Sequence, residues 1–204
     1  LAQREGRAKD SNDRTQEGLI KMLSMYSGGD IIDALKVLNI APTTISYEYD
    51  PCDYLKAKEF QQKRDNPEWK KAPQDDLINM KTGMFGYKGG IHYHIADCIN
   101  DEIDAIDRSL GRNEKTAAVA RIIDKHIHSN YKFWAINYYF YELLTGDTRF
   151  ADKYTADEKA KLDAYLQGQI AKVDLPNRDD EFCRTKILEM YANPVINYLK
   201  ATEK

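Results

Sequence analysis

The sequence predicts an α-rich α/β protein, in which a short sheet with flanking helices (residues 1–99) is followed by an all-helical segment (residues 100–204). Residues 40–49 are rich in threonine, isoleucine and tyrosine, which favour strands. Residues 91–98 alternate with the two-residue period of a strand. Beyond residue 100 the apolar residues recur at helical spacing. A chain of 204 residues with 42% hydrophobic residues can form one domain with a helical appendage.

The first half combines short helices with the predicted strands. Asp30 is a suitable N-cap for the second helix, because its side chain can accept a hydrogen bond from a free backbone N–H. Pro42 should lie at the start or the edge of its strand, since proline cannot donate to a ladder. The helices expected in this half span residues 16–26, 31–38, 53–64 and 75–84.

The second half is expected to contain only helices. Thr155 and Glu158 have the spacing of a capping box. Pro194 is expected to kink or break the last helix, because it lacks the backbone N–H that a helix interior needs. The helices expected here span residues 101–110, 114–129, 132–145, 155–173 and 180–199.

Composition excludes several classes of protein. A net charge of −3 disfavours nucleic-acid binding, which needs clustered lysine and arginine. The three cysteines are widely separated, so we expect small buried side chains in a reducing cytoplasm rather than disulfides. The sequence contains no run of 18 or more apolar residues, so no segment is expected to span a membrane. His126 and His128 point in different directions on a helix and should be surface or capping residues, so no metal or cofactor is expected.

The opening residues suggest an anion site. Residues 1–15 are predicted to form a strand end, a turn at Gly6, a cationic loop and a helix start. Arg7, Lys9 and Arg14 place three cations in this loop, and the N-terminus of the following helix would face it. Such a place suits phosphate. The alternative is an ordinary solvated loop.

The same stretch resembles a conserved block of the glycerolipid acyltransferase superfamily. Glu5-Gly6 matches the centre of the family's Phe-Pro-Glu-Gly-Thr-Arg-Ser block, although Gln3-Arg4 replaces Phe-Pro and the basic residue comes one position early, as Arg7. The segment 40–46 resembles the family's Val-Pro-Val strand. Together with residues 47–52, it is similar to a bacterial subgroup of acyltransferases. The resemblance covers residues 1–99, as the C-terminal part of an acyltransferase-like domain.

The resemblance implies a function in phospholipid biosynthesis. The parent protein would transfer an acyl group from a coenzyme A or acyl carrier protein thioester to the hydroxyl of a glycerol-phosphate-type acceptor. Glu5 and Gly6 would shape the acceptor pocket, and Pro42 would belong to the strand beside it. Arg7, Lys9 and Arg14 would bind the phosphate through charge-assisted hydrogen bonds. A cytoplasmic protein, or one lying peripherally on the inner face of the membrane, is implied.

The family's catalytic pair, His-x-x-x-x-Asp, has one literal match here, His92 to Asp97. We interpret it as a coincidence, because it follows the Glu-Gly block whereas the family's pair precedes it. Residues five apart on a strand also face opposite sides. The true pair is therefore expected before Leu1, in a longer parent protein, and this chain alone should be inactive.

Three alternatives remain open. The aromatic run 131–141 suits a buried helix, or a face for membrane or an acyl chain. Gly83, Gly86, Gly89 and Gly90 lie near Lys81 and Lys88 and suit a chain turn, or a phosphate loop. The whole chain could instead be a non-catalytic helical interaction module on a small α/β base. An exposed sheet edge would favour a homodimer.

Overall fold

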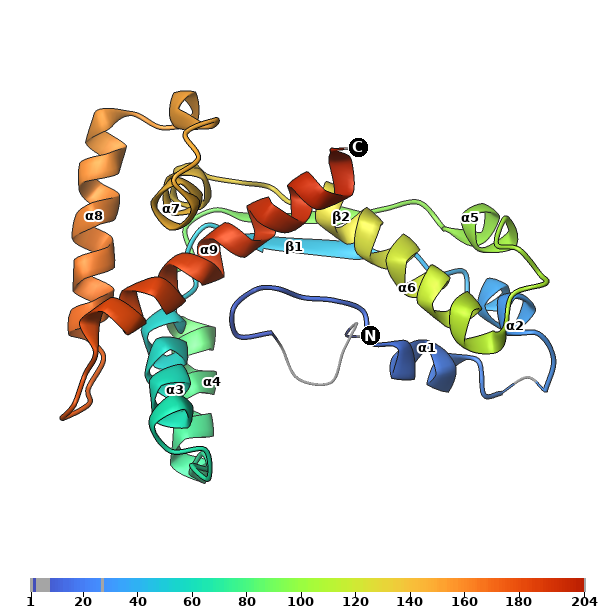
Figure 1. Cartoon of the computed structure of the whole chain (residues 1–204), viewed down its shortest axis with the longest axis horizontal. Coiled ribbons are helices and arrows are strands. Elements are labelled where there is room, and N and C mark those ends of the chain that lie inside the picture. The colour runs from blue at the N-terminus through green and yellow to red at the C-terminus, as the bar shows by residue number, and fades with distance from the viewer. Residues whose placement is uncertain (1, 3–7, 27, 204) are drawn as a thin grey trace.

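The computed structural model describes residues 2, 8–26 and 28–203, and in them helices surround one small sheet (Figure 1). This confirms the coarse prediction of an α-rich α/β class. The elements of the first half are α1 (Glu17–Leu23), α2 (Ile31–Val37), β1 (Thr43–Tyr47), α3 (Asp53–Asp65), α4 (Pro73–Phe85) and β2 (Ile91–Ile95). Those of the second half are α5 (Asn100–Asp104), α6 (Arg112–Ser129), α7 (Ala135–Thr145), the 3₁₀ helix η1 (Ala151–Lys153), α8 (Ala156–Ala171) and α9 (Asp180–Thr202).

The sheet consists of β1 and β2 in antiparallel pairing, with Ile45 opposite Tyr93. One face of β1 packs on the protein, where Thr44 Oγ1 donates to the carbonyl of Ile127 at 3.0 Å. Ser46 Oγ accepts from the backbone N–H of Lys132 at 3.0 Å. These two bonds attach β1 to the C-terminal end of α6 and the segment after it.

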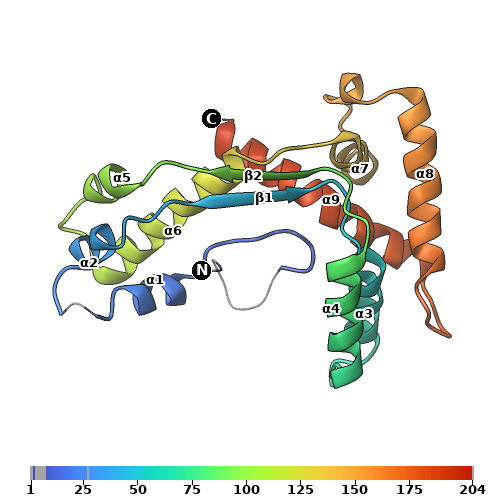
Figure 2. The same ribbon diagram turned by 180° about the vertical axis from the view of Figure 1, so that it is seen from behind.

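The two larger hydrophobic cores lie toward opposite ends of the strands (Figures 1 and 2). One combines α1 and α2 with α5 and α6, and Ile32, Ile103 and Val119 are fully buried in it. The other combines α3 with α7, α8 and α9, around Phe140 and Ile187. Each core therefore draws helices from both sides of residue 99.

Helix α9 connects these parts of the molecule. It runs diagonally from the lower end of α8 toward α6, in front of the sheet in Figure 1 and behind it in Figure 2. It packs most extensively on α7 and also contacts α3, α6 and α8. Helices α3 and α4 project side by side away from it, and the loop before α1 lies between this pair and α1.

Several local predictions are confirmed. The Asp30 side chain accepts from the N–H of Ile32 at 2.8 Å, and α2 follows it. Thr155 and Glu158 form a capping box at the start of α8. Pro42 directly precedes β1, and its carbonyl accepts from the N–H of Ala96 at 2.9 Å. Local hydrogen-bonding chemistry fixes these boundaries, which is why sequence alone located them.

The break expected at Pro194 was wrong. Helix α9 continues through Pro194 to Thr202, although proline deprives the carbonyl of Met190 of its helical donor. Ala192 and Val195 are fully buried and pack with Tyr141 of α7. This packing on both sides of the proline holds the helix together.

Two other helices differ in length from the prediction. Helix α5 ends at Asp104 rather than near Leu110, and the Asp107 side chain accepts from the N–H of Ser109 in a local turn at 2.8 Å. Helix α7 begins only at Ala135, where Asn137 Oδ1 accepts from the N–H of Trp134 at 3.0 Å. In both cases a polar side chain bonds the nearby backbone and competes with helix formation.

The aromatic and cysteine predictions are partly confirmed. Tyr139, Phe140 and Tyr141 are buried, as expected for a core helix. Cys183 is buried, but Cys98 is exposed, so the prediction of a buried side chain was wrong there. Among the described residues, no helix has both the length and the apolar character that a membrane span requires.

Candidate functional site

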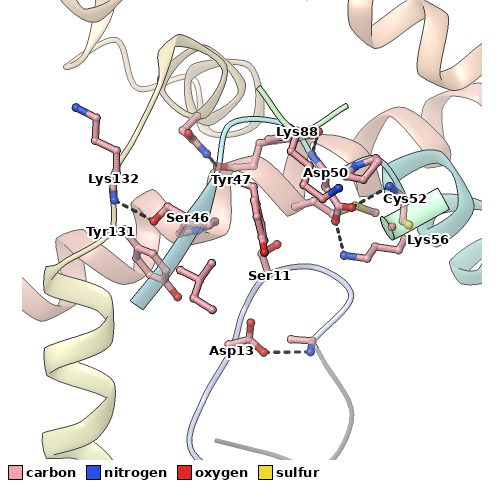
Figure 3. A pocket seen from close by; sticks show the side chains of 18 of the residues that line it. Ser11, Asp13, Ser46, Tyr47, Asp50, Cys52, Lys56, Lys88, Tyr131 and Lys132 are labelled. Carbon is pink, nitrogen blue, oxygen red and sulfur yellow. Dashed lines mark hydrogen bonds and ion pairs between the residues drawn. The ribbon is translucent and has the colours of Figure 1, made fainter. Parts of the chain in front are cut away.

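A cleft of about 720 Å³ lies between the loop before α1, strand β1 and helices α4 and α9 (Figure 3). Ser11 and Asp13 line it from the loop, and Ser46 and Tyr47 line it from β1. Tyr191 of α9 closes another side. The sequence analysis had assigned both the loop and the strand after Pro42 to one site, and the structure brings the two segments to the same cleft.

The loop is held in place by side chains that are distant in the sequence. Asn193 Nδ2 donates to the carbonyl of Asp10 at 2.8 Å. Thr15 donates through both N–H and Oγ1 to Asp124 Oδ1, at 2.8 and 2.6 Å. His128 Nε2 lies 2.9 Å from the carbonyl oxygen of Asp13. His128 is therefore a buried anchor, and its prediction as a surface or capping residue was wrong.

The predicted phosphate residues have different positions. Glu5, Gly6 and Arg7 lie outside the described residues. Arg14 is exposed and does not line the cleft. Pro42 is buried immediately before Thr43, which does line the cleft. Pro42 itself lies just before β1 and does not line the cleft.

Lys9 pairs with Glu59, a nearly buried carboxylate on α3. Two further ammonium groups lie near the same carboxylate, Lys63 Nζ at 3.0 Å and Lys71 Nζ at 4.0 Å. Burial, followed by the repulsion of Lys63 and Lys71, lowers the pKa of Lys9 to about 8. Lys71 also pairs with Asp76 at 2.7 Å, so three lysines share two carboxylates, and the remaining positive charge makes this face of α3 attractive to anions.

Three other lysines line the cleft itself. Lys56 forms an ion pair with Asp50. Lys88 Nζ donates to main-chain carbonyls, those of Gly86 at 3.0 Å and Met84 at 3.2 Å. Neither Lys88 nor Lys132 forms an ion pair with a carboxylate in the part of the chain that the structure describes. The cleft therefore offers cationic donors whose charge is not fully neutralised.

The cleft also has an apolar wall. Ile45 projects from β1, Met80 and Met84 from α4, and Met190 from α9. Methionine side chains adapt their shape to irregular ligands. A molecule with an anionic head and an apolar body would therefore find both kinds of contact in one cleft.

A buried carboxylate that the sequence analysis did not single out lies behind this cleft. Asp53 accepts from Tyr165 OH at 2.6 Å, from Tyr191 OH at 2.9 Å and from Gln169 Nε2 at 2.6 Å. Burial raises the pKa of Asp53, and the three hydrogen bonds oppose this effect. Tyr191 OH in turn accepts from the N–H of Asp50 at 3.0 Å. The network fixes the β1–α3 turn on α8 and α9. No motif signalled it, because its partners are far apart in the sequence.

The glycines after α4 form a turn. Gly89 adopts a φ of +62°, which disfavours other residues. A Cβ at Gly90 would lie 2.7 Å from Nε1 of Trp134, so a side chain there would collide with the indole. Gly90 N–H donates to Glu48 Oε2 at 2.8 Å. These contacts agree with the predicted turn, and Lys88 is the only residue of 86–90 that lines the cleft.

The literal match His92–Asp97 lies away from the cleft. His92 is exposed on β2, opposite Ser46, and Asp97 lies beyond the end of the strand. Neither residue lines the cleft. No group of three or more histidine, cysteine or acidic side chains among the described residues could hold a metal ion.

Comparisons with known proteins add no family to this geometry. The sequence matches no family model, and searches of curated proteins and of solved structures give no match either. The cleft, and the resemblance of the opening residues and segment 40–46 to acyltransferase blocks, are therefore the two grounds for a proposed function.

Proposed function

We propose that this chain is the C-terminal portion of an acyltransferase, and that its cleft binds a glycerol-phosphate-type acceptor. The supporting observation is the convergence of the loop 8–14 and strand β1 on one cleft with lysines and an apolar wall. The loop directly follows the Glu5-Gly6 block of the resemblance, which lies outside the described residues, and β1 overlaps the segment 40–46. Their convergence is what the proposal requires.

The chemistry of the cleft suits such an acceptor. Lys56 and Lys88 supply ammonium donors for a phosphate, and bonds of this charge-assisted type are strong. Lys9 of the loop, which pairs with Glu59 on α3 and is repelled by Lys56, adds positive potential. The side chains of Ile45, Met80 and Met84 would cover the glycerol backbone and the first part of an acyl chain.

The acyl-transfer step needs a general base that the described cleft does not provide. No histidine lines the cleft. We assign the base to the His-x-x-x-x-Asp motif of the parent protein, where the histidine would remove the proton from the acceptor hydroxyl as that oxygen attacks the thioester carbonyl. The C–S bond would then break, and the histidine would pass the proton to the departing thiolate of coenzyme A or acyl carrier protein. The acyl thioester, of coenzyme A or of acyl carrier protein, would be the second substrate. This chain alone should bind the acceptor without turning it over.

Calorimetric titration with glycerol 3-phosphate and with its 1-acyl derivative tests the proposal. Lys56→Glu and Lys88→Glu should each weaken binding by about tenfold or more, because a favourable contact becomes repulsive. Lys9→Glu should have a smaller effect. Lys161→Glu, an exposed change on α8, is the matched control and should bind normally. Unchanged affinity in the Lys56 and Lys88 variants would remove the acceptor from this cleft.

The non-catalytic interaction module stays as a second candidate, because one observation favours it. Helix α4 has no buried residue, and several of its large apolar side chains are exposed. An interaction module would bind its partner protein through α4. The Lys56→Glu and Lys88→Glu variants would then bind that partner as well as the wild type does. The calorimetric series therefore also separates the two candidates.

A further inference from the structure

Helix α4 turns its polar side to the protein and its apolar side to solvent. On the side facing α3, the carbonyl of Asn79 lies 3.4 Å from the thiol of Cys52, and Gly83 lies against the same sulfur. The opposite side carries five large apolar side chains that are 50–78% exposed. They are Leu77, Ile78, Met80, Met84 and Phe85, and together with Lys81 we call them the α4 face.

The α4 face is one continuous stripe. With about 100° between successive residues of a helix, its members fall within an arc of roughly 160°. A helix of a globular protein normally points such a stripe into the core. Exposed apolar patches of this kind mark places where proteins bind partners or membranes.

Charge indicates which partner suits the α4 face. Lys81 lies inside the stripe, and Lys88 follows just after the helix. The two acidic residues are both in the first turn, where Asp75 Oδ2 accepts from the N–H of Ala72 at 3.0 Å and Asp76 pairs with Lys71 at 2.7 Å. The apolar end of the helix is therefore cationic, although the whole chain carries −3.

A lysine within an apolar stripe fits a lipid surface better than a protein interface. The cores of protein interfaces are depleted of lysine. At a membrane, lysine extends its ammonium to the headgroups while its methylene stem stays among apolar atoms. Aromatic residues also favour the membrane–water boundary, and Phe85 and Tyr87 are the two most exposed aromatic side chains at this end of the helix.

The position of the cleft agrees with this partner. Met80 and Met84 belong to the α4 face and also line the cleft. A lipid surface in contact with the α4 face would therefore lie next to the cleft.

We propose that α4 lies on an anionic lipid surface, with the α4 face among the headgroups and Lys81 bound to their phosphates. The proposal concerns attachment only, so it holds or fails independently of acyl transfer. Amphipathic helices bind membranes in this way through apolar area and basic charge.

Co-sedimentation with vesicles tests the proposal. The wild-type chain should bind vesicles that contain phosphatidylglycerol, bind purely phosphatidylcholine vesicles less, and lose binding as salt rises. Replacing Leu77 and Phe85 by glutamine should lower the partition coefficient at least about tenfold, because two exposed apolar anchors are lost. Lys81→Glu should lower binding to anionic vesicles on the order of tenfold and leave binding to neutral ones nearly unchanged.

The matched control replaces Met22 and Val37 by glutamine. These side chains are equally exposed but lie in α1 and α2, at the other end of the molecule. The control should bind vesicles like the wild type. The proposal is overturned if the wild type does not bind anionic vesicles, or if the control loses as much binding as the α4 variant. It is also overturned if sedimentation shows only self-association that the α4 variant abolishes.

Discussion

Helices α9 and α4 form two walls of the same cleft, but they are supported in different ways. Behind Tyr191 of α9 lies the core that contains Phe140 and Ile187. Behind Met84 of α4, Gly83 and the carbonyl of Asn79 contact Cys52, and no residue of α4 is buried. The α9 wall is therefore held by a packed core, whereas the α4 wall is held by few contacts and leaves its outer face exposed.

The largest expected difference between the two walls is in backbone hydrogen exchange. Amides of α4 from Asn79 to Phe85 should exchange on the order of a hundredfold or more faster than those of α9 from Leu188 to Ala192, because short, unburied helices open locally. Mass-spectrometric exchange measures both in one experiment. Equal exchange rates would show that α4 is supported as well as α9. Slower exchange of α4 alone, in the presence of anionic vesicles, would show that lipid contact supplies the support that α4 lacks.

The stability of the α9 wall can be tested at Phe140. Its ring is fully buried and meets the ring of Tyr191 edge-on, with 5.4 Å between centroids. Phe140→Ala should lower the free energy of unfolding by about 3–5 kcal/mol, through lost burial and a cavity. Phe85→Ala in α4, where the ring is 78% exposed, is the control and should change it by less than about 0.5 kcal/mol. Urea denaturation measures both, and similar losses would show that α4 is as well supported as α9.

A smaller effect is expected at the hydrogen bonds behind the α9 wall. Tyr191→Phe removes one of the donors to the buried Asp53 and the acceptor for the N–H of Asp50. We expect a loss of about 1–3 kcal/mol in the free energy of unfolding, because buried polar groups lose their partners. The ring itself remains, so packing is preserved. A midpoint in urea equal to that of the wild type would mean that Tyr191 acts through packing alone.

The sequence predicted what short-range chemistry determines. The cap at Asp30, the capping box at Thr155 and the position of Pro42 were all recognisable from neighbouring residues. The structure differs where distant segments decide. Burial against α7 carries α9 through Pro194, and the carbonyl of Asp13 captures His128. No periodicity could reveal these contacts.

The candidate site was predicted in outline only. Ser11 and Asp13 of the loop and Thr43 of the strand after Pro42 line one cleft, but Lys9 does not line it. Lys56 was not expected there, since in the sequence it reads as an ordinary helix residue, whereas Lys88 belongs to the glycine-rich stretch that suited a chain turn or a phosphate loop. Asp53 was missed because Tyr165 and Tyr191 join it from other helices.

The bonds from α9 to the opening loop have a consequence for synthesis on the ribosome. Asn193 and Asn197 donate to the backbone of Asp10 and the side chain of Asn12, across 183 and 185 positions of sequence. A growing chain can build the core around α6 long before α9 leaves the exit tunnel, because domains fold as their segments emerge. The cleft, however, can be completed only after α9 has emerged. An incomplete chain would therefore not yet have the complete binding site.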